Sequence, residues 1–320
     1  TRLTAGSDSL AEYKAVTGKK VFEKLFPVLA SAVDNDIRLA YRGGFTYASP
    51  RFKGTMQGKG SVYDVNSLYP HVMYSQLLPY GTPEWEAGLP TATKGYPLFI
   101  VSMTFTAELK PDHIPLIQVK GASIFSETEY QESITEPVTL SFTNVDLELI
   151  FKHYDVQVLS YNGGWKFKAG RGMFRKFIDK WSAIKENSEG ALRAIAKLHL
   201  NSLYGKFASN PNVTGKYPVL ENDMVKLKLG VEATRDPVYT AMGAFITAYA
   251  RHIMITAAQT NFDRFAYCDT DSAHLMGTEP PLGMVIHDTE LGTWAHEGDF
   301  DQAFYIRAKG YMERLITCRH

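Results

Sequence analysis

The sequence is poor in cysteine and has no long apolar run. Its 320 residues include two cysteines, Cys268 and Cys318, too few for a disulfide framework, and no Cys-x-x-Cys or Cys/His spacing indicates structural zinc. No stretch approaches the roughly 18 apolar residues of a bilayer-spanning helix, and the N-terminus lacks the pattern of a secretory signal. We therefore expect a protein of a reducing compartment, the cytoplasm, with no membrane partner.

The chain also has no net charge, because 34 Lys and Arg balance 34 Asp and Glu. The charges are nevertheless unevenly distributed. Residues 165–216 hold eleven Lys or Arg and three acids, whereas residues 262–301 hold nine acids and one Arg. An acidic metal site facing a basic phosphate-binding region has the electrostatics of nucleotidyl transfer. Taken alone, a basic helix face is more often simply solvated.

Local patterns predict an α+β fold in which helices pack on an antiparallel sheet. Residues 75–168 contain short alternating apolar runs between Pro and Gly turns and are predicted to form a mixed insertion. Residues 171–207 have helical periodicity, broken at 187–190, where Ser188 is the expected N-cap of a second helix. Runs at 213–220 and 224–229 predict a β-hairpin, and residues 241–259 predict a long apolar helix.

Three aspartates are candidate metal ligands. Asp64 ends a β-forming run, and Asp269 and Asp271 lie at the tip of a predicted strand–turn–strand over residues 264–275. If that tip stays extended, both of its carboxylates point to one side and converge on Asp64 when the strands are neighbours. Such a set suits two Mg²⁺ ions in a phosphoryl transfer. An isolated Asp-x-Asp pair more commonly caps a turn.

A basic face is expected on the second predicted helix. Arg193, Lys197 and Asn201 recur every four residues and so share one face, Tyr204 follows one turn later, and Lys185 closes the preceding helix. Phosphates of a triphosphate or of DNA are the expected ligands.

Four ordered motifs resemble the protein-primed branch of the B-family DNA polymerases of small tailed phages. Residues 64–70 (DVNSLYP) are similar to the family's DxxSLYP, 197–205 (KLHLNSLYG) to KxxxNSxYG, 267–272 (YCDTDS) to YxDTDS, and 309–311 (KGY) to KxY. The resemblance runs over nearly the whole chain. It implies a polymerase palm with two-helix fingers and two insertions.

The resemblance also implies a function: template-directed addition of deoxynucleotides to a primer or terminal-protein hydroxyl, with two Mg²⁺ ions for which Mn²⁺ can substitute. The implied partners are primer-template DNA, deoxynucleoside triphosphates and a terminal protein, in the cytoplasm of a bacterial host. Tyr69 would be the steric gate that rejects a 2′-hydroxyl. Arg193 departs from the lysine common in the family, which changes the geometry of a phosphate contact.

Each site residue has an implied role. The catalytic residues would be Asp64, Asp269 and Asp271, and the metal ligands Asp64, the Val65 carbonyl and Asp271. The nucleotide would contact Val65, Ser67, Leu68, Tyr69, Lys185, Arg193, Lys197, Asn201 and Tyr204. DNA would contact Tyr41, Gly43, Gly44, Ser202, Gly205, Thr270, Lys309 and Tyr311.

The expected domains follow the same resemblance. Residues 1–74 and 237–320 would form the palm, 75–168 the insertion that docks terminal protein, 169–206 the fingers and 207–236 a hairpin that aids strand displacement. No acidic exonuclease motif or thumb is found in the sequence, so we expect both to be absent, with no proofreading and poor processivity.

Two alternatives stay open at this point. The chain could be a catalytically incomplete fragment that only binds DNA or terminal protein. A polymerase that makes or copies RNA would share the palm chemistry, although the Asp-Thr-Asp-Ser tip and Tyr69 argue against it.

Overall fold

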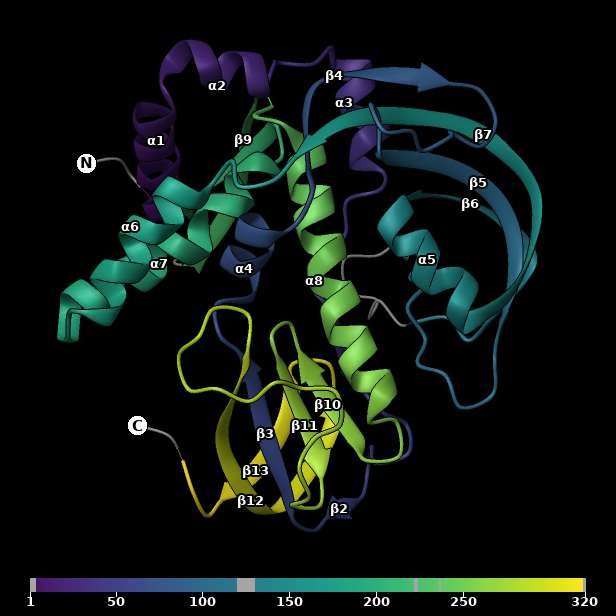
Figure 1. Ribbon diagram of the computed structural model, residues 1–320, viewed down its shortest axis with the longest axis vertical. Coiled ribbons are helices and arrows are strands. Elements are labelled where there is room, and N and C mark those ends of the chain that lie inside the picture. Colours follow the sequence, from purple (N-terminus) through teal and green to yellow (C-terminus); the bar gives the residue numbers. More distant parts are fainter. Residues whose placement is uncertain (1–3, 120–129, 222–223, 236, 319–320) are drawn as a thin grey trace.

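A long helix, α8 (Thr240–Thr260), lies at the centre of the molecule in the computed structural model, which describes residues 4–119, 130–221, 224–235 and 237–318 (Figure 1). Its side chains are buried along most of its length, as expected of a helix that is apolar all round. Gly243 allows close packing here, because a Cβ at this position would lie 2.4 Å from the Cβ of Ala208. The predicted helix at 241–259 is thus confirmed. No helix in the described ranges is long and apolar enough to cross a bilayer.

The remaining helices lie on both sides of α8, and some of them form the arm at the left of Figure 1. They are α1 (Ala5–Thr17), α2 (Lys19–Leu25), α3 (Ser31–Arg38), α4 (Leu68–Ser75), α5 (Asn144–His153), α6 (Arg175–Glu186) and α7 (Gly190–Phe207).

The strands are β1 (Thr46–Ala48), β2 (Met56–Gln57), β3 (Gly60–Val65), β4 (Leu78–Glu86), β5 (Leu98–Leu109), β6 (Ser133–Thr143), β7 (Tyr154–Gly170), β8 (Asn212–Glu221), β9 (Met224–Thr234), β10 (Phe265–Asp269), β11 (Ser272–Met276), β12 (Trp294–Arg307) and β13 (Gly310–Leu315). Within the described residues they form three antiparallel sheets. The α+β prediction is confirmed.

The largest sheet, at the bottom of Figure 1, has the order β1-β10-β11-β3-β12-β13, with β2 paired to β12. Strand β3 lies between β11 and β12, and Asp64 is directly opposite Ser272. The sheet curls, because residues of β10 and β12 share a second small core that includes Tyr267, Phe300 and Tyr305. The predicted strand–turn–strand at 264–275 is confirmed, and it neighbours the strand of Asp64.

A second sheet, in the order β4-β7-β5-β6, arches at the right of Figure 1 and holds α5 in its curve. Its strands fall almost entirely within the predicted insertion at 75–168. The separate pair β8 and β9 confirms the predicted hairpin and extends it to Thr234. The expected turn at 221–223 begins with Glu221, which belongs to β8, while residues 222–223 lie outside the described residues. The domain limits themselves stay predictions.

Helices α6 and α7 confirm the predicted helix pair, but the expected cap at Ser188 is wrong. Helix α7 begins at Gly190, its N-cap is Glu189, and no side-chain hydrogen bond caps it. Gly190 has a positive φ of 56°, which a glycine adopts without the steric penalty of a side chain. The chain therefore turns at the glycine, and the serine is not needed as a cap.

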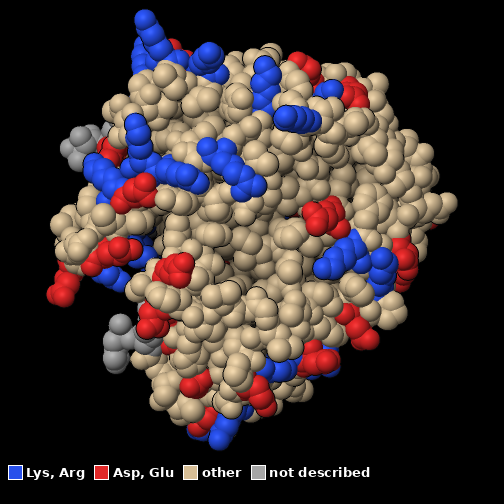
Figure 2. Space-filling view, viewed as in Figure 1, with Lys and Arg blue, Asp and Glu red and all other residues tan. Residues whose placement is uncertain are grey.

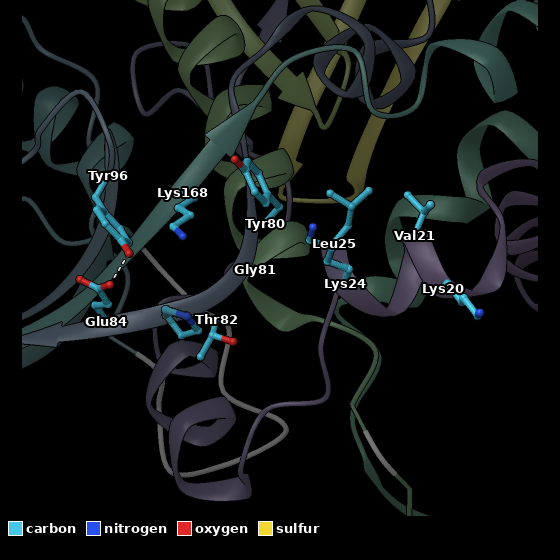
Figure 3. Close-up of a pocket in the computed structure, with 11 residues that line it drawn as sticks. Lys20, Val21, Lys24, Leu25, Tyr80, Gly81, Thr82, Glu84, Tyr96 and Lys168 are labelled. Atoms are coloured by element: carbon cyan, nitrogen blue, oxygen red, sulfur yellow. Dashed lines mark hydrogen bonds between the residues drawn. The ribbon is translucent and has the colours of Figure 1, made fainter.

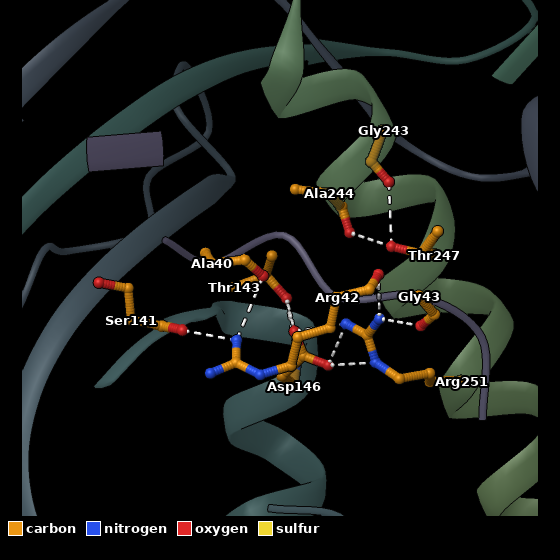
Figure 4. Close-up of polar contacts among 10 residues, drawn as sticks. All are labelled: Ala40, Arg42, Gly43, Ser141, Thr143, Asp146, Gly243, Ala244, Thr247 and Arg251. Carbon is orange, nitrogen blue, oxygen red and sulfur yellow. Dashed lines mark hydrogen bonds and ion pairs between the residues drawn. The ribbon is translucent and has the colours of Figure 1, made fainter. Parts of the chain in front are cut away.

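A buried ion pair ties the second sheet to α8 (Figure 4). Arg251 of α8 donates to both carboxylate oxygens of Asp146, at 2.7–3.1 Å, and both side chains are 6 % exposed. Asp146 lies at the start of α5, where its backbone N–H donates to the N-cap hydroxyl of Thr143. Arg251 also donates to the carbonyls of Arg42 and Gly43. One guanidinium thus fixes three segments that are distant in sequence.

Replacing Asp146 with alanine should destabilise the fold strongly. The guanidiniums of Arg251 and of the nearby half-buried Arg42 would lose their compensating charge, and breaking one partner of a buried pair costs about 3–5 kcal/mol. Urea denaturation would measure the change. The matched control is Asp155→Ala, which removes an exposed pair with Lys110 and should cost at most about 1 kcal/mol. Equal losses in the two variants would contradict the assigned role of Asp146.

Candidate active site

The turn between β10 and β11 brings Asp271 beside Asp64. Thr270 takes a left-handed conformation (φ 68°), and the N–H of Asp271 donates to the carbonyl of Asp269 at 2.8 Å. The N–H of Val65 then donates to the carbonyl of Asp271, also at 2.8 Å. The tip is therefore not extended, and the expectation that extended geometry aligns Asp269 with Asp271 is wrong. A left-handed turn reverses the chain between the two carboxylates.

The negative charge of Asp271 acts on the half-buried carboxyl group of Asp64. The pKa of Asp64 is raised to about 7, chiefly by burial and in part by the negative charges of Asp271 and Glu297, against the opposing effect of Lys197 and Lys185. Burial likewise raises the pKa of Asp271, with a contribution from Asp269. Two half-buried acids that repel one another create a site in which a cation would be stabilised.

Two lysines from the α6–α7 pair reach this acidic site. Lys185 Nζ lies 3.1 Å from the hydroxyl of Ser67, which precedes α4 in a left-handed conformation. Burial lowers the pKa of Lys185, and the charges of Arg193 and Lys197 lower it further. Arg193 donates to the carbonyl of Lys185 at 3.0 Å and so joins the two helices. Of the basic residues predicted on α7, Lys197 acts on Asp64 and Asp271, whereas Arg193 contacts Lys185.

An aromatic wall stands next to the carboxylates. The rings of Tyr69 and Tyr204 are stacked with centroids 3.9 Å apart, and burial beside Tyr204 raises the pKa of the Tyr69 hydroxyl. Tyr41 is close enough to Tyr204 for its pKa to be raised as well, although burial is the larger cause. Leu68, beside Tyr69, is buried.

The loop before β1, residues 41–45, packs against this aromatic wall. A Cβ added to Gly44 would lie 2.8 Å from the methyl group of Thr270 and 2.9 Å from the Tyr69 hydroxyl oxygen. Only a glycine therefore fits at this position without displacing its neighbours. The N–H of Thr270 donates to the Phe45 carbonyl at 2.8 Å, which fixes the loop to the β10–β11 turn.

Lys309 and Tyr311 lie on the other side of the turn. The Lys309 ammonium contacts the carboxylate of Asp269, and the ring of Tyr311 lies 4.6 Å from that of Tyr267. Asp269 therefore faces the β12–β13 turn, whereas Asp271 faces Asp64. The three aspartates occupy one region but do not form one equivalent set.

Four predicted site residues have surroundings that differ from those of the residues described above. Asn201 is exposed on α7, and the carbonyl of Ser202 packs against Gly6 of α1. Gly205 has no neighbour that a Cβ would meet, and the same is true of Gly43, whose carbonyl accepts a hydrogen bond from Arg251.

A cavity of about 790 Å³ opens between α2 and the start of β4 (Figure 3). None of the predicted site residues lines it. Lys20, Lys24 and Lys168 reach its rim, and the Tyr96 hydroxyl donates to Glu84. The cavity is thus separate from the acidic site.

The donor set fits a magnesium site that is completed by substrate. Among the described residues, no group of three or more His, Cys, Asp or Glu side chains is placed to hold a metal. Asp64 and Asp271 supply two carboxylates, and Mg²⁺ is usually held by one or two carboxylates together with waters and substrate phosphates. The mutual repulsion of these two acids is what such an ion would relieve.

The charges on the visible face follow the sequence pattern. Figure 2 shows Lys and Arg gathered on the upper part, over the helices, and Asp and Glu predominating on the lower part, over the large sheet. Sequence patterns missed Glu297, which acts on Asp64, and the link between Arg251 and the 41–45 loop. No local pattern indicated either, since both depend on strands and helices distant in sequence.

This arrangement is the palm and fingers of a B-family polymerase, and the chain belongs to the family described as DNA polymerase type B, organellar and viral, whose model matches residues 1–286. It is 52 % identical over 318 residues to the DNA polymerase of Bacillus phage phi29 and 34 % identical over 327 residues to that of Streptococcus phage Cp-1. A solved structure of phi29 DNA polymerase with primer-template DNA and incoming nucleotide matches with a TM-score of 0.92, at 51 % identity over 98 % of this chain.

The chain spans about half the length of these relatives, 55 % of the phi29 polymerase and 57 % of the Cp-1 polymerase, while 98 % and 99 % of the chain itself is matched. The structural match covers 56 % of the solved chain. The predicted resemblance to phage B-family polymerases is confirmed.

Replacing Asp271 with asparagine should lower the pKa of Asp64, because a neighbouring negative charge is removed. Burial should still hold it above the ordinary value of 3.8. Carboxyl NMR titration of the metal-free protein would measure both values. Since the raised pKa means that Asp64 ionises less readily when folded, its contribution to stability falls as the pH rises toward 7. Asp269→Asn is the control, and an equal shift there would contradict the pairing of Asp64 with Asp271.

Proposed function

We propose that this chain is the catalytic core of a template-directed DNA polymerase, which adds deoxynucleotides to a primer 3′-hydroxyl. The observation that carries the proposal is the placement of Asp64 and Asp271 against Lys185 and Lys197, which contribute opposing charges at one site. Acids that hold a cation, facing bases that hold phosphates, are what nucleotidyl transfer needs. The solved relative bound to primer-template DNA and nucleotide supports the same substrates.

In the proposed mechanism Asp64, the Val65 carbonyl and Asp271 hold two Mg²⁺ ions, or Mn²⁺ in their place. When bound, such ions lower the pKa of an attacking hydroxyl and offset the charge on the leaving pyrophosphate. Lys197, Lys185 and Arg193 bind and orient the triphosphate, with Ser67 held by Lys185. Lys309 and Tyr311 orient the primer strand from the opposite side.

The aromatic wall of Tyr69 and Tyr204 would border the pocket for the new base pair. Tyr69 is held between Tyr204 and Gly44, so its ring has little room to move away from a bulkier sugar. We propose that it excludes the 2′-hydroxyl, with Leu68 supporting it and Asn201 bordering the same pocket. Tyr41, Gly43, Gly44, Thr270, Ser202 and Gly205 would border the DNA.

The insertion at 75–168 is proposed to dock a terminal protein, whose hydroxyl would replace the primer in initiation. The hairpin of β8 and β9 is proposed to assist strand displacement. We place the reaction in the cytoplasm of a bacterial host, since the relatives are polymerases of bacteriophages.

A second candidate is a fragment that binds DNA or terminal protein without turnover. Binding of primer-template DNA with no extension at high protein concentration would support it.

Primer extension with Mg²⁺ and deoxynucleotides tests the first candidate. Asp271→Ala should lower the rate by about three orders of magnitude or more, because several kcal/mol of charge stabilisation is lost. Asp263→Ala is the matched control, since that side chain is 89 % exposed and pairs with Arg51 at the surface. The proposal fails if the native chain binds DNA but does not extend it, or if both variants extend equally.

Tyr69→Val should admit ribonucleotides. Removing the ring opens space beside the sugar, and we expect the preference for deoxynucleotides to fall on the order of tenfold or more, which corresponds to about 1.4 kcal/mol. Tyr74→Val, the same change on the same helix, should leave the preference unchanged, because the Tyr74 ring packs under Arg175. Competition between deoxynucleotides and ribonucleotides measures the ratio of their incorporation. An unchanged ratio in Tyr69→Val would contradict the proposal that Tyr69 excludes the 2′-hydroxyl.

A further inference from the structure

The buried carboxylate of Glu313 on β13 contacts the hairpin formed by β10 and β11. Oε1 of Glu313 lies 2.6 Å from His274 Nδ1 and 2.8 Å from the Tyr305 hydroxyl. The side chains of His274 and Glu313 are 2 % and 7 % exposed. His274 is on β11, three residues beyond Asp271, so the contact joins the β10–β11 hairpin to β13 although the two strands are not paired in the sheet.

The contact between Glu313 and His274 lies next to Lys309 and Tyr311. The ring of Tyr311 is 5.0 Å from that of His274 and 4.6 Å from that of Tyr267. The Tyr267 hydroxyl accepts the backbone N–H of Lys309 at 2.9 Å, and Lys309 itself has a left-handed φ of 61°. Contacts with Tyr267 of β10 and His274 of β11 therefore hold the turn between β12 and β13 in place.

The buried hydrogen bonds of Glu313 fix the relative positions of the strands that they join. A carboxylate removed from water is costly unless its oxygens accept hydrogen bonds, and here the imidazole and phenol both donate to one oxygen. For the imidazole to donate at Nδ1, its proton must be on that nitrogen. Apolar side chains of similar volume would serve stability as well or better, but they would not fix the position of β13 against β11.

We propose that Glu313 and His274 are positioning residues for the primer strand. They hold the β12–β13 turn so that Lys309 and Tyr311 face the sugar-phosphate backbone at the primer 3′ end, beside Asp271. Neither residue touches the DNA. The proposal rests on the proposed function, and it adds a link between the strand that carries the metal site and the turn that contacts the primer.

The test compares three variants of this chain. Glu313→Ala should weaken binding of primer-template DNA on the order of tenfold, a loss of about 1.4 kcal/mol, with the KM for the incoming nucleotide unchanged. Glu313→Gln should restore binding to within about threefold, because its amide oxygen still accepts both hydrogen bonds. Arg314→Ala is the matched control, since Arg314 is the next residue and forms an exposed pair with Asp301 of β12; it should bind DNA like the native chain.

Fluorescence anisotropy with labelled primer-template gives the affinity without requiring turnover, so failure of extension and failure of this proposal are separable. Hydrogen–deuterium exchange without DNA should be faster at residues 310–315 in Glu313→Ala than in Arg314→Ala. If Glu313→Ala does not fold, Tyr305→Phe removes one of the two hydrogen bonds and should weaken DNA binding by a smaller factor. Native DNA affinity in Glu313→Ala, or a rise in nucleotide KM equal to the loss of DNA affinity, would overturn the proposal.

Discussion

The left-handed turn at Thr270 is the constraint on which the site depends. It places Asp271 over the end of β3, where the N–H of Val65 holds its carbonyl, and it directs Asp269 away toward Lys309. A residue with a side chain adopts this conformation only at a cost of about 1 kcal/mol or more, so the surrounding contacts must stabilise it. The Phe45 carbonyl and the close approach of Gly44 provide those contacts.

Helix α8 connects this turn to the rest of the molecule. Arg251 is paired with Asp146 of α5 and also binds the carbonyls of Arg42 and Gly43, just before the segment that contacts Thr270. Helix α5 and the loop that packs on the Thr270 turn therefore share one buried guanidinium. The hydrogen bonds of Arg251 thus join the start of α5 to the segment that precedes Gly44.

The electrostatics of the site are balanced by opposing charges from different elements. Asp64 and Asp271 repel each other, while Lys197 on α7 and Lys185 on α6 reduce the cost of ionising Asp64. The basic and acidic segments that cancel in the total charge are thus brought face to face by the fold. A neutral chain can in this way present a strongly polar site.

The sequence by itself determined the elements and the family. Helical periodicity gave α6, α7 and α8, alternation gave the β8–β9 hairpin, and the four motifs identified the B-family palm, because these signals lie within short segments. Tertiary structure decided the rest. Local spacing suggested that the carboxylates of Asp269 and Asp271 point to one side if the tip stays extended, but the left-handed turn at Thr270 reverses the chain between them. Ser188 was not needed as a cap once Gly190 turned the chain. The pairs Arg251–Asp146 and His274–Glu313 join residues that are 105 and 39 positions apart, and only the packing of strands and helices brings such residues into contact.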